Sequence, residues 1–337
     1  MSATTIPEGP QAIFQIYFGM LPGRALATAV QLDIFSPLAD GPRDAAAVAA
    51  AIKASPRGVR MLLDAMASMR LLSKSDGGYA LTPLARAHLL RASPDYAAAM
   101  LENDELWNAW TGLPEVVRTG RPVMAVERQE QAEDFFPVLI RSLHVMNRRP
   151  ARQLAAALAT HGGAALDVAC GSAVWSIACA EADPALRVVA HDFPGVLDET
   201  RGYVARHGLS DRFDYLAGNL RTVDFGSARY DVALLGNIVH GEGERLSRAL
   251  FERMHRALRP GGRIVVIDFV PDDDRAGPPP PVLFALNMLV HTAEGDTFTL
   301  SEYTRWLTEA GFAEVKAIPL GDGPVRLATA VVAVTRG

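Results

Sequence analysis

The sequence predicts an α/β protein with a doubly wound, Rossmann-like sheet in its C-terminal half and a helical winged-helix domain before it. With 337 residues, the chain is long enough for two domains that each bury a core. Apolar residues follow a helical period up to about residue 160, and beyond that point short strands alternate with helices. Such alternation predicts a parallel sheet whose ligand lies at the carboxyl ends of the strands.

The overall composition argues against several classes of protein. Hydrophobic residues make up 49% of the chain and charged residues 21%, which does not fit a disordered or fibrous protein. The net charge of −5 disfavours nucleic-acid binding through bulk electrostatics. The two cysteines, Cys170 and Cys179, form no CxxC pair, and neither a signal peptide nor a membrane-spanning apolar run stands out. We therefore expect a soluble, cytoplasmic protein that binds neither nucleic acid nor membranes.

The N-terminal part has the element order of a winged helix. Three helices and then a small hairpin are expected, at residues 11–31, 44–54, 55–69 and 71–81. Asp44 and Ser55 can cap the second and third helices, because their side-chain oxygens accept hydrogen bonds from the free amides of a first turn. Pro56 then occupies the first helical position, where its missing N–H costs nothing.

A winged helix also suggests DNA binding, which the third predicted helix disfavours. After its first turn, this helix is mostly apolar and offers no series of Asn, Gln, Arg or Lys to read base edges. An apolar helix at this position favours packing against protein, including a second subunit. A regulator that senses a metabolite through its α/β domain remains an alternative.

The C-terminal half predicts seven strands with helices between them. The strands are expected at residues 165–169, 186–191, 213–217, 230–235, 263–270, 315–319 and 329–334. The helices are expected at residues 174–181, 196–207, 245–258 and 301–310. Residues 94–160, which precede this half, are again helical, and their aromatic side chains either fill a core or cover a substrate.

The turn after the first strand favours a cationic cofactor that lacks phosphate. Asp192, at the end of the second strand, lies 21 residues beyond Gly171, a spacing at which a carboxylate can accept hydrogen bonds from ribose hydroxyls. The turn lacks the GxGxxG spacing of a pyrophosphate cradle. Asp167 would repel a phosphate, whereas an ammonium group tolerates a nearby carboxylate. A nicotinamide oxidoreductase is therefore the less favoured alternative.

Polar residues follow the third and fourth strands at the same predicted edge. Asn219 and Leu220 come after the third strand, where a polar side chain can face an adenine edge, and Gly236 and Asn237 come after the fourth. His240 follows one turn later, close to where a reactive group must lie. Because histidine exchanges protons near neutral pH, His240 is either a general base or a surface histidine in a glycine-rich loop.

Six motifs now point to one family. They are residues 167–173, Asp192-Phe193-Pro194, Gly218-Asn219, Asn237-Ile238-Val239-His240, Leu258-Arg259-Pro260-Gly261-Gly262 and Glu309-Ala310-Gly311-Phe312. In order and spacing they resemble the caffeate/acetylserotonin-type small-molecule O-methyltransferases, including the bacterial natural-product branch. The resemblance covers nearly the whole chain, since that family carries an N-terminal winged-helix dimerisation domain.

The resemblance implies an enzyme that uses S-adenosylmethionine, releases S-adenosylhomocysteine and needs no metal. His240 would remove a proton from a hydroxyl of a small aromatic or polyketide-like acceptor, and Asp268 would orient His240. The residues that the resemblance places around the cofactor are Asp167, Gly171, Asp192, Phe193, Asn219, Leu220, Gly236 and Asn237. It further implies a homodimer through residues 1–95, linking helices in residues 96–160 and a cofactor-binding domain in residues 161–337.

The substrate pocket would be built from the linking helices and the segment after the fifth strand. The candidates are Trp110, Phe136, Leu139, Leu143, His144, Asn287, Met288 and His291. Asn287 and His291 share a helical face and either bind an acceptor oxygen or cap backbone, while Met288 is a ligand contact or core filler. Residues 278–281 predict a stiff surface connection before this helix.

Two departures from the family pattern keep other reactions open. Ala169 and Ala173 stand where the family usually has glycine, so we expect the turn to differ slightly around the cofactor. Thr297, with Asp296 beside it, stands where the family often has a second acidic residue. C- or N-methylation, or a relative that binds the cofactor without methylating, therefore remain alternatives to O-methylation.

Overall fold

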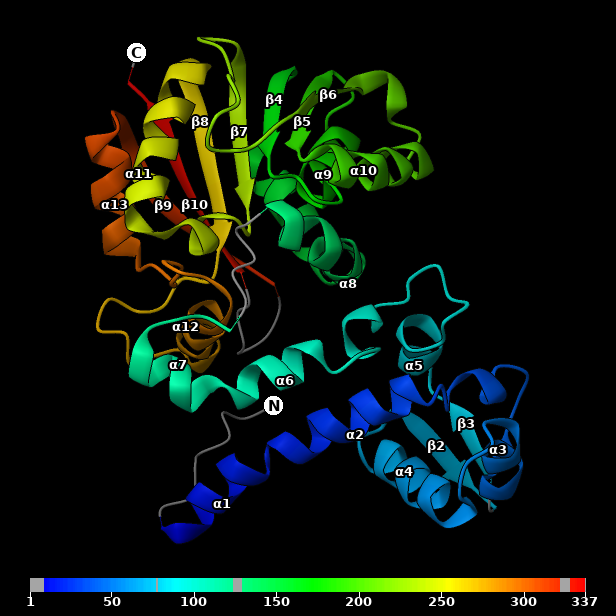
Figure 1. Ribbon diagram of the computed structural model, residues 1–337. Helices are drawn as coiled ribbons and strands as arrows, with labels where there is room; N and C mark the ends of the chain where they lie inside the picture. The colour runs from blue at the N-terminus through cyan, green and yellow to red at the C-terminus, as the bar shows by residue number, and fades with distance from the viewer. Residues whose placement is uncertain (1–8, 77, 124–128, 322–327, 337) are drawn as a thin grey trace. The chain divides into compact units, whose positions relative to one another are not determined.

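The computed structural model divides the chain into two compact units (Figure 1). The first unit comprises Met1–Leu106 and Arg141–Val145, and the second comprises Trp107–Ile140 and Met146–Gly337. The structure describes residues 9–76, 78–123, 129–321 and 328–336, with the backbone alone for residues 129–138. In these residues, no helix is both long and apolar enough to cross a membrane.

The first unit has the predicted winged-helix order. Its helices are α1 (Pro10–Phe18), α2 (Met20–Gln31), α3 (Ala45–Ala51), α4 (Pro56–Ser68) and α5 (Pro83–His88), with short 3₁₀ turns η1 (Ser36–Leu38) and η2 (Ala99–Leu101). The strands β1 (Arg43–Asp44), β2 (Leu72–Ser75) and β3 (Gly78–Leu81) form an antiparallel sheet in the order β1-β3-β2. Asp44 caps α3 by accepting from the Ala47 amide at 2.7 Å, and Ser55 caps α4, as predicted.

The prediction of one helix over residues 11–31 is wrong in its continuity. Gly19 separates α1 from α2, which agrees with the low helix propensity of glycine. No residue of α1 is buried. Its large apolar side chains are instead at least half exposed: Ile13, Phe14, Ile16, Tyr17 and Phe18. A contiguous apolar patch of this kind marks a surface that associates with protein.

The second unit contains a seven-stranded sheet in the order β6-β5-β4-β7-β8-β10-β9. Its strands are β4 (Gly163–Val168), β5 (Leu186–Asp192), β6 (Phe213–Ala217), β7 (Tyr230–Gly236), β8 (Leu258–Asp268), β9 (Phe312–Leu320) and β10 (Ala328–Thr335). The first five strands pair in parallel, as predicted. β10 runs antiparallel to both β8 and β9. The connection from β9 to β10 is too short for a parallel crossover, which accounts for the pairing of these two strands.

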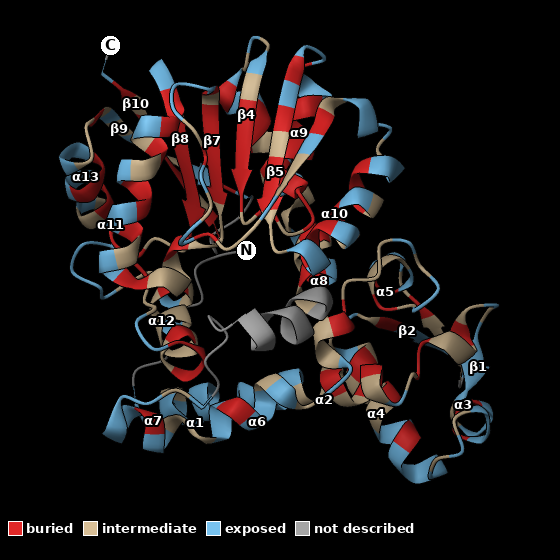
Figure 2. Cartoon of the chain, turned by 45° about the horizontal axis from the view of Figure 1, so that its top comes forward, coloured by how far each residue is buried: buried red, intermediate tan, exposed pale blue. Residues whose placement is uncertain are grey.

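Helices cover both faces of this sheet. On one face lie α8 (Gln129–Leu158), α9 (Val174–Ala182) and α10 (Pro194–Arg206), and on the other lie α11 (Val239–Ala257) and α13 (Leu300–Glu309) (Figure 1). Successive side chains of a strand point to opposite faces of the sheet. Ala165 therefore packs in the core on the side of α8, α9 and α10, and Leu166 packs in the core on the side of α11 and α13. Figure 2 shows the central strands largely buried, as a doubly wound sheet requires.

Three further helices are α6 (Glu105–Thr111), whose residues from Trp107 on belong to the second unit, α7 (Leu113–Thr119) and α12 (Pro279–His291). α7 packs against α12, and the Val123 amide donates to the Val290 carbonyl at 2.9 Å. The prediction of a stiff surface connection over residues 278–281 is wrong, because α12 already begins at Pro279. Prolines fit a first helical turn, whose amides have no intrahelical acceptor.

The two-faced packing predicts different costs for the same substitution on two helices of the second unit. Leu307 on α13 is fully buried, whereas Leu283 on α12 is 56% exposed. We expect Leu307→Ala to lower the free energy of unfolding by about 2–5 kcal/mol, and Leu283→Ala to change it by less than about 0.5 kcal/mol. Urea denaturation measures both, and equal losses would contradict the described core.

Candidate active site at the carboxyl edge of the sheet

His240 lies on the first turn of α11 and not in a loop. α11 begins at Val239, ahead of the expected start at Arg245, and bends at Gly243, which has φ 72° and ψ 169°. A Cβ on Gly243 would lie 2.7 Å from the Glu294 Cβ, so this bend requires glycine. The imidazole is therefore held on a short turn at the carboxyl edge of the sheet.

The imidazole of His240 is paired with the last residue of β8. Its Nδ1 lies 2.5 Å from Oδ1 of Asp268, and its backbone amide donates to Oδ2 at 3.1 Å. Asp268 is fully buried, and the His240 side chain is 12% exposed. An ionised carboxylate can only accept, so Nδ1 donates and Nε2 remains the atom that can take a proton. This geometry fits a histidine base with an orienting carboxylate.

Two aromatic rings that the sequence analysis missed flank this imidazole. The centroid of the Phe284 ring lies 5.0 Å from that of His240 at 84°, and Phe269 lies 6.2 Å away. The two phenyl rings stack on each other at 4.0 Å. The sequence offered a signal for each ring. Phe269 directly follows Asp268, and Phe284 shares a helical face with Asn287, three residues further on. The rings give the histidine an apolar, partly enclosed surrounding.

The segment after α12 packs closely on the backbone of His240. The Asp296 amide donates to the His240 carbonyl at 2.9 Å. A Cβ on Gly295 would approach that same carbonyl to 2.6 Å, so the segment can pass only as glycine. Thr297, at the family's second acidic position, is buried, and its hydroxyl has no partner among the described residues.

The turn after β4 keeps a glycine-like backbone although two of its residues are alanines. Ala169, Gly171 and Ala173 have φ of 52°, 54° and 57°. For an alanine this left-handed conformation costs about 1–2 kcal/mol. The Gly171 amide donates to Oδ2 of Asp192 at 2.9 Å, which ties the turn to the end of β5. The turn thus stores strain next to the predicted cofactor site.

Asp192 lies at the end of β5 with its carboxylate directed into this turn. Oδ1 accepts from the Phe193 amide at 2.8 Å, and Oδ2 accepts from Gly171. Burial raises the pKa of Asp192 to about 6, against the lowering effect of these two amides. Each carboxylate oxygen keeps a second lone pair, so Asp192 can still accept from two vicinal hydroxyls. Phe193, half-buried, precedes α10 as its N-cap residue.

Asp167 lies beneath the turn, between β4 and α9. Ser176 donates to its Oδ2 at 2.5 Å, whereas Oδ1 has no partner among the described residues. Burial raises the pKa of Asp167 to about 7, and the charge of Asp192 adds to this, while the Ser176 hydroxyl lowers it. An unsatisfied carboxylate oxygen at this place fits a nearby cationic group and does not fit a phosphate.

The remaining predicted cofactor residues lie at the ends of β6 and β7. Asn219 turns the chain by accepting from the Arg221 amide at 2.9 Å, and the neighbouring Leu220 is buried. Asn237 follows β7 with φ 59°, and its amide donates to the Ile267 carbonyl at 2.8 Å. At Gly236, a Cβ would come within 2.4 Å of Nε1 of Trp175. Trp175, which the sequence analysis did not single out, therefore fixes Gly236 as glycine.

The structure brings only some of the predicted substrate residues together. Nε1 of Trp110 donates to Oδ1 of Asn287 at 3.1 Å, which joins α6 to α12. His291 is buried, with Nδ1 at 2.9 Å from the Asn287 carbonyl oxygen, and Met288 is buried too. Leu139 is half-buried in the second unit, Leu143 and His144 belong to the first unit, and the Phe136 side chain lies outside the described residues.

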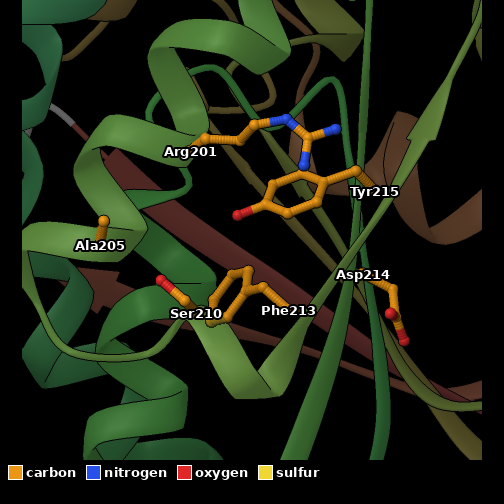
Figure 3. Close-up of a pocket in the computed structure, with 6 residues that line it drawn as sticks. All are labelled: Arg201, Ala205, Ser210, Phe213, Asp214 and Tyr215. Atoms are coloured by element: carbon orange, nitrogen blue, oxygen red, sulfur yellow. The ribbon is translucent and has the colours of Figure 1, made fainter.

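In the described parts of the chain, no group of three or more His, Cys, Asp or Glu side chains could hold a metal ion. An open hollow of about 630 Å³ lies between α10 and β6 (Figure 3). Its lining includes Phe213, the first residue of β6, and Arg201, which stacks on Tyr215 at 3.9 Å. The hollow thus extends to the amino end of an edge strand, and we assign no chemistry to it.

The raised pKa of Asp167 predicts a pH-dependent stability. The Asp167 carboxyl binds its proton more tightly in the folded state than in the unfolded state, where its pKa is about the ordinary 3.8. Its contribution to the free energy of unfolding is therefore present near pH 4 and is lost as the pH rises to about 7. We expect Asp167→Asn to gain stability over the wild type across this range, by about 4 kcal/mol at most.

Asp183 is the matched control in the same unit. The pKa of Asp183 is lowered, mainly because its carboxylate accepts a hydrogen bond from the Gly162 amide. Its contribution to stability is therefore present above the ordinary pKa of 3.8 and is lost as the pH falls below it. Asp183→Asn should be less stable than the wild type above this pH, and the difference should shrink as the pH falls. Urea denaturation at several pH values measures both variants. A constant difference between Asp167→Asn and the wild type would contradict the burial of an unsatisfied Asp167 carboxylate.

Comparison with known proteins gives the family. Residues 110–313, more than half of the chain, match the model of the O-methyltransferase domain, and residues 14–91 match that of the O-methyltransferase dimerisation domain. The tetracenomycin polyketide synthesis 8-O-methyl transferase TcmO of Streptomyces glaucescens is 32% identical and aligns over 97% of this chain and 98% of its own length.

Two acetylserotonin enzymes agree with this match. The acetylserotonin O-methyltransferase of Bos taurus is 30% identical over 92% of this chain and 94% of its own. The crystal structure of human N-acetylserotonin methyltransferase, in complex with S-adenosylmethionine, superposes with a TM-score of 0.84 at 25% identity and covers both chains completely. The chain therefore belongs to the O-methyltransferase family.

Proposed function

We propose that this protein transfers a methyl group from S-adenosylmethionine to a hydroxyl of a small aromatic or polyketide-like molecule, with His240 as the general base. The observation that carries the proposal is the hydrogen bond between Nδ1 of His240 and the buried Asp268 at the carboxyl edge of the sheet. The family match supports the reaction, and relatives named for polyketide and naphthoate methylation support the acceptor class.

The residues around the turn after β4 fit S-adenosylmethionine. Asp192 would accept hydrogen bonds from the ribose hydroxyls, and Asn219 and Leu220 would line the adenine. The unsatisfied oxygen of Asp167 would favour the positive charge of the methionine part. When bound, the cofactor supplies a methyl group on a positively charged sulfur, which is lost readily to a nucleophile.

The chain's own residues prepare the nucleophile. Nε2 of His240 accepts the proton of the acceptor hydroxyl, and Asp268 stabilises the imidazolium that results. The oxygen then forms its bond to the methyl carbon as the carbon–sulfur bond breaks, with the electron pair going to sulfur. Phe269 and Phe284 would keep a flat acceptor against the imidazole and exclude water, so that the reacting atoms stay aligned. Trp110 and Asn287 would bound the far side of the acceptor.

A C- or N-methyltransferase is the second candidate. The observation in its favour is Thr297, whose buried hydroxyl provides no charge at the position of the family's second acidic residue. Such an enzyme would depend more on alignment of its substrates than on proton removal. The two candidates differ in how strongly they need His240.

The first unit would supply the homodimer contact. The match of residues 14–91 to a dimerisation domain supports this, as does the exposed apolar face of α1. An apolar groove between α2 and α4, lined by Leu32, Met61 and Leu62 among others, is a second apolar surface in this unit.

We further propose residues 1–95 as the dimerisation domain, 96–160 as linking helices and 161–337 as the cofactor-binding domain. The free thiols of Cys170 and Cys179 support a location in the cytoplasm.

His240→Ala tests the function directly. We expect it to keep S-adenosylmethionine affinity within about threefold, because His240 does not belong to the proposed cofactor contacts. Turnover with a hydroxyl acceptor should fall by about 10²–10⁴, the usual contribution of a general base. Isothermal titration calorimetry with S-adenosylmethionine and an acceptor screen with mass detection of the gained methyl group measure the two properties.

His207→Ala is the matched control. His207 also pairs with a carboxylate, Glu181 at 2.7 Å, but this pair joins α9 to the end of α10 at the surface. His207→Ala should change neither the affinity for S-adenosylmethionine nor the turnover with a hydroxyl acceptor. Wild-type turnover in His240→Ala would exclude the general base and favour C- or N-methylation, and failure of the wild type to bind either S-adenosylmethionine or S-adenosylhomocysteine would overturn the proposed function.

A further inference from the structure

Tyr303 contacts Asp268 at Oδ2, the carboxylate oxygen that does not bind the imidazole of His240. It lies on α13, is fully buried, and its hydroxyl donates to Oδ2 of Asp268 at 3.0 Å. Burial raises the pKa of the phenol well above its ordinary value, and the charge of Asp268 raises it further, so the hydroxyl remains a donor. Tyr303 does not contact His240 and can act on it only through Asp268.

The bond from Tyr303 completes the hydrogen bonding of this carboxylate. Oδ1 of Asp268 accepts from Nδ1 of His240 at 2.5 Å and from the Phe269 amide at 2.8 Å. Oδ2 accepts from the His240 amide at 3.1 Å and from Tyr303. These four bonds use the four lone pairs of an ionised carboxylate. Apart from His240, Tyr303 is the one side chain recorded as donating to Asp268 in the described structure.

Among the described residues, aromatic side chains contact the Tyr303 ring. The ring packs among Phe251, Phe298 and Trp306. The two phenylalanines have no polar hydrogen to donate to Oδ2 of Asp268. Trp306 already donates its Nε1 proton to Glu244. Without the Tyr303 hydroxyl, Oδ2 of Asp268 would lose one of its two hydrogen bonds in an apolar surrounding. A carboxylate that is held at fewer points would orient the imidazole less firmly.

The position of α13 is itself firmly determined. Thr299 and Glu302 form a reciprocal capping box at its start, and Arg275 binds both carboxylate oxygens of Glu302, at 3.0 and 2.9 Å. The same guanidinium donates to the Thr297 carbonyl at 2.8 Å. The helix that carries Tyr303 is therefore tied to the segment that packs on His240.

We propose that Tyr303 is a positioning residue for the methyl transfer, the third member of a His240–Asp268–Tyr303 relay, because its hydroxyl holds Oδ2 of Asp268 and so keeps Oδ1 directed at Nδ1 of His240. This inference rests on the proposed function of His240 as a base. It predicts that the loss of the hydroxyl weakens proton removal and leaves cofactor binding intact.

Tyr303→Phe removes the hydroxyl and keeps the ring. We expect its kcat to fall roughly tenfold with 1-naphthol, whose hydroxyl is protonated at assay pH, and less than twofold with 4-nitro-1-naphthol, which is already ionised. The KM for S-adenosylmethionine should stay within twofold. A merely structural role would lower the rate with both acceptors alike.

Tyr79→Phe is the matched control. Tyr79 is buried in the first unit, and its hydroxyl donates to Oδ1 of Asp64 at 2.7 Å, so the substitution also deletes a tyrosine–carboxylate hydrogen bond, but in the unit that does not carry His240. Asp64 is partly exposed and has Lys74 as a further partner, so Tyr79→Phe should lower the thermal midpoint no more than Tyr303→Phe does. It should leave kcat unchanged with both acceptors. A comparable loss of kcat in Tyr79→Phe would overturn the proposal.

A spectroscopic readout makes the test independent of turnover. The Nδ1 proton of His240 should give a downfield proton resonance in the wild type and Tyr79→Phe, absent in His240→Ala, and shifted or broadened in Tyr303→Phe. An unchanged resonance, or wild-type kcat with 1-naphthol, would overturn the role of Tyr303. If His240→Ala keeps wild-type turnover, the proposed base fails; if only Tyr303→Phe keeps it, the base stands and the relay fails.

Discussion

The buried carboxylate of Asp268 is the constraint on which the site depends. A charge at the end of a central strand is tolerated only when its lone pairs are filled, and here the donors come from the start of α11, the end of β8 and the middle of α13. The same bonds that satisfy the charge therefore fix the histidine and dock two helices on the sheet. Under the proposed function, one interaction therefore serves both stability and chemistry. The histidine itself lies on a short turn that Gly243 separates from the rest of its helix.

Close backbone approach is the second recurring device. Gly243 and Gly295 let the segment after α12 pass against the first turn of α11, and Gly236 makes room for the indole of Trp175. Around the turn after β4, positive φ values are kept even at Ala169 and Ala173, where a methyl group makes them costly. Strain of this kind is held where surrounding contacts over-determine the backbone, and here the bond from Gly171 to Asp192 is one of those contacts. The turn thus has a fixed backbone at the place where we propose that the cofactor binds.

Much of the fold could be predicted from the sequence, because strands that are buried on both faces and helices with clear caps leave strong local patterns. Asp44 and Ser55 act as caps, and Gly171 and Asp192 meet at one edge, as their spacing requires. The local pattern failed where tertiary packing decides. The glycines near His240 indicated a loop, yet they form a kinked helix; the prolines before α12 indicated a connection, yet they begin the helix. Phe284, Trp175 and Tyr303 could not be assigned, since each meets its partner across a long separation in the chain.

A crystal structure of the protein with S-adenosylhomocysteine and an accepted hydroxyl substrate would test the role of His240 most directly. We expect the acceptor oxygen to lie within hydrogen-bonding distance of Nε2 of His240, in line with the cofactor sulfur, while Nδ1 still contacts Asp268. The aromatic part of the acceptor should lie beside Phe284 and Phe269. An ordered acceptor whose oxygen faces another side chain, with His240 turned away from Asp268, would contradict the central claim.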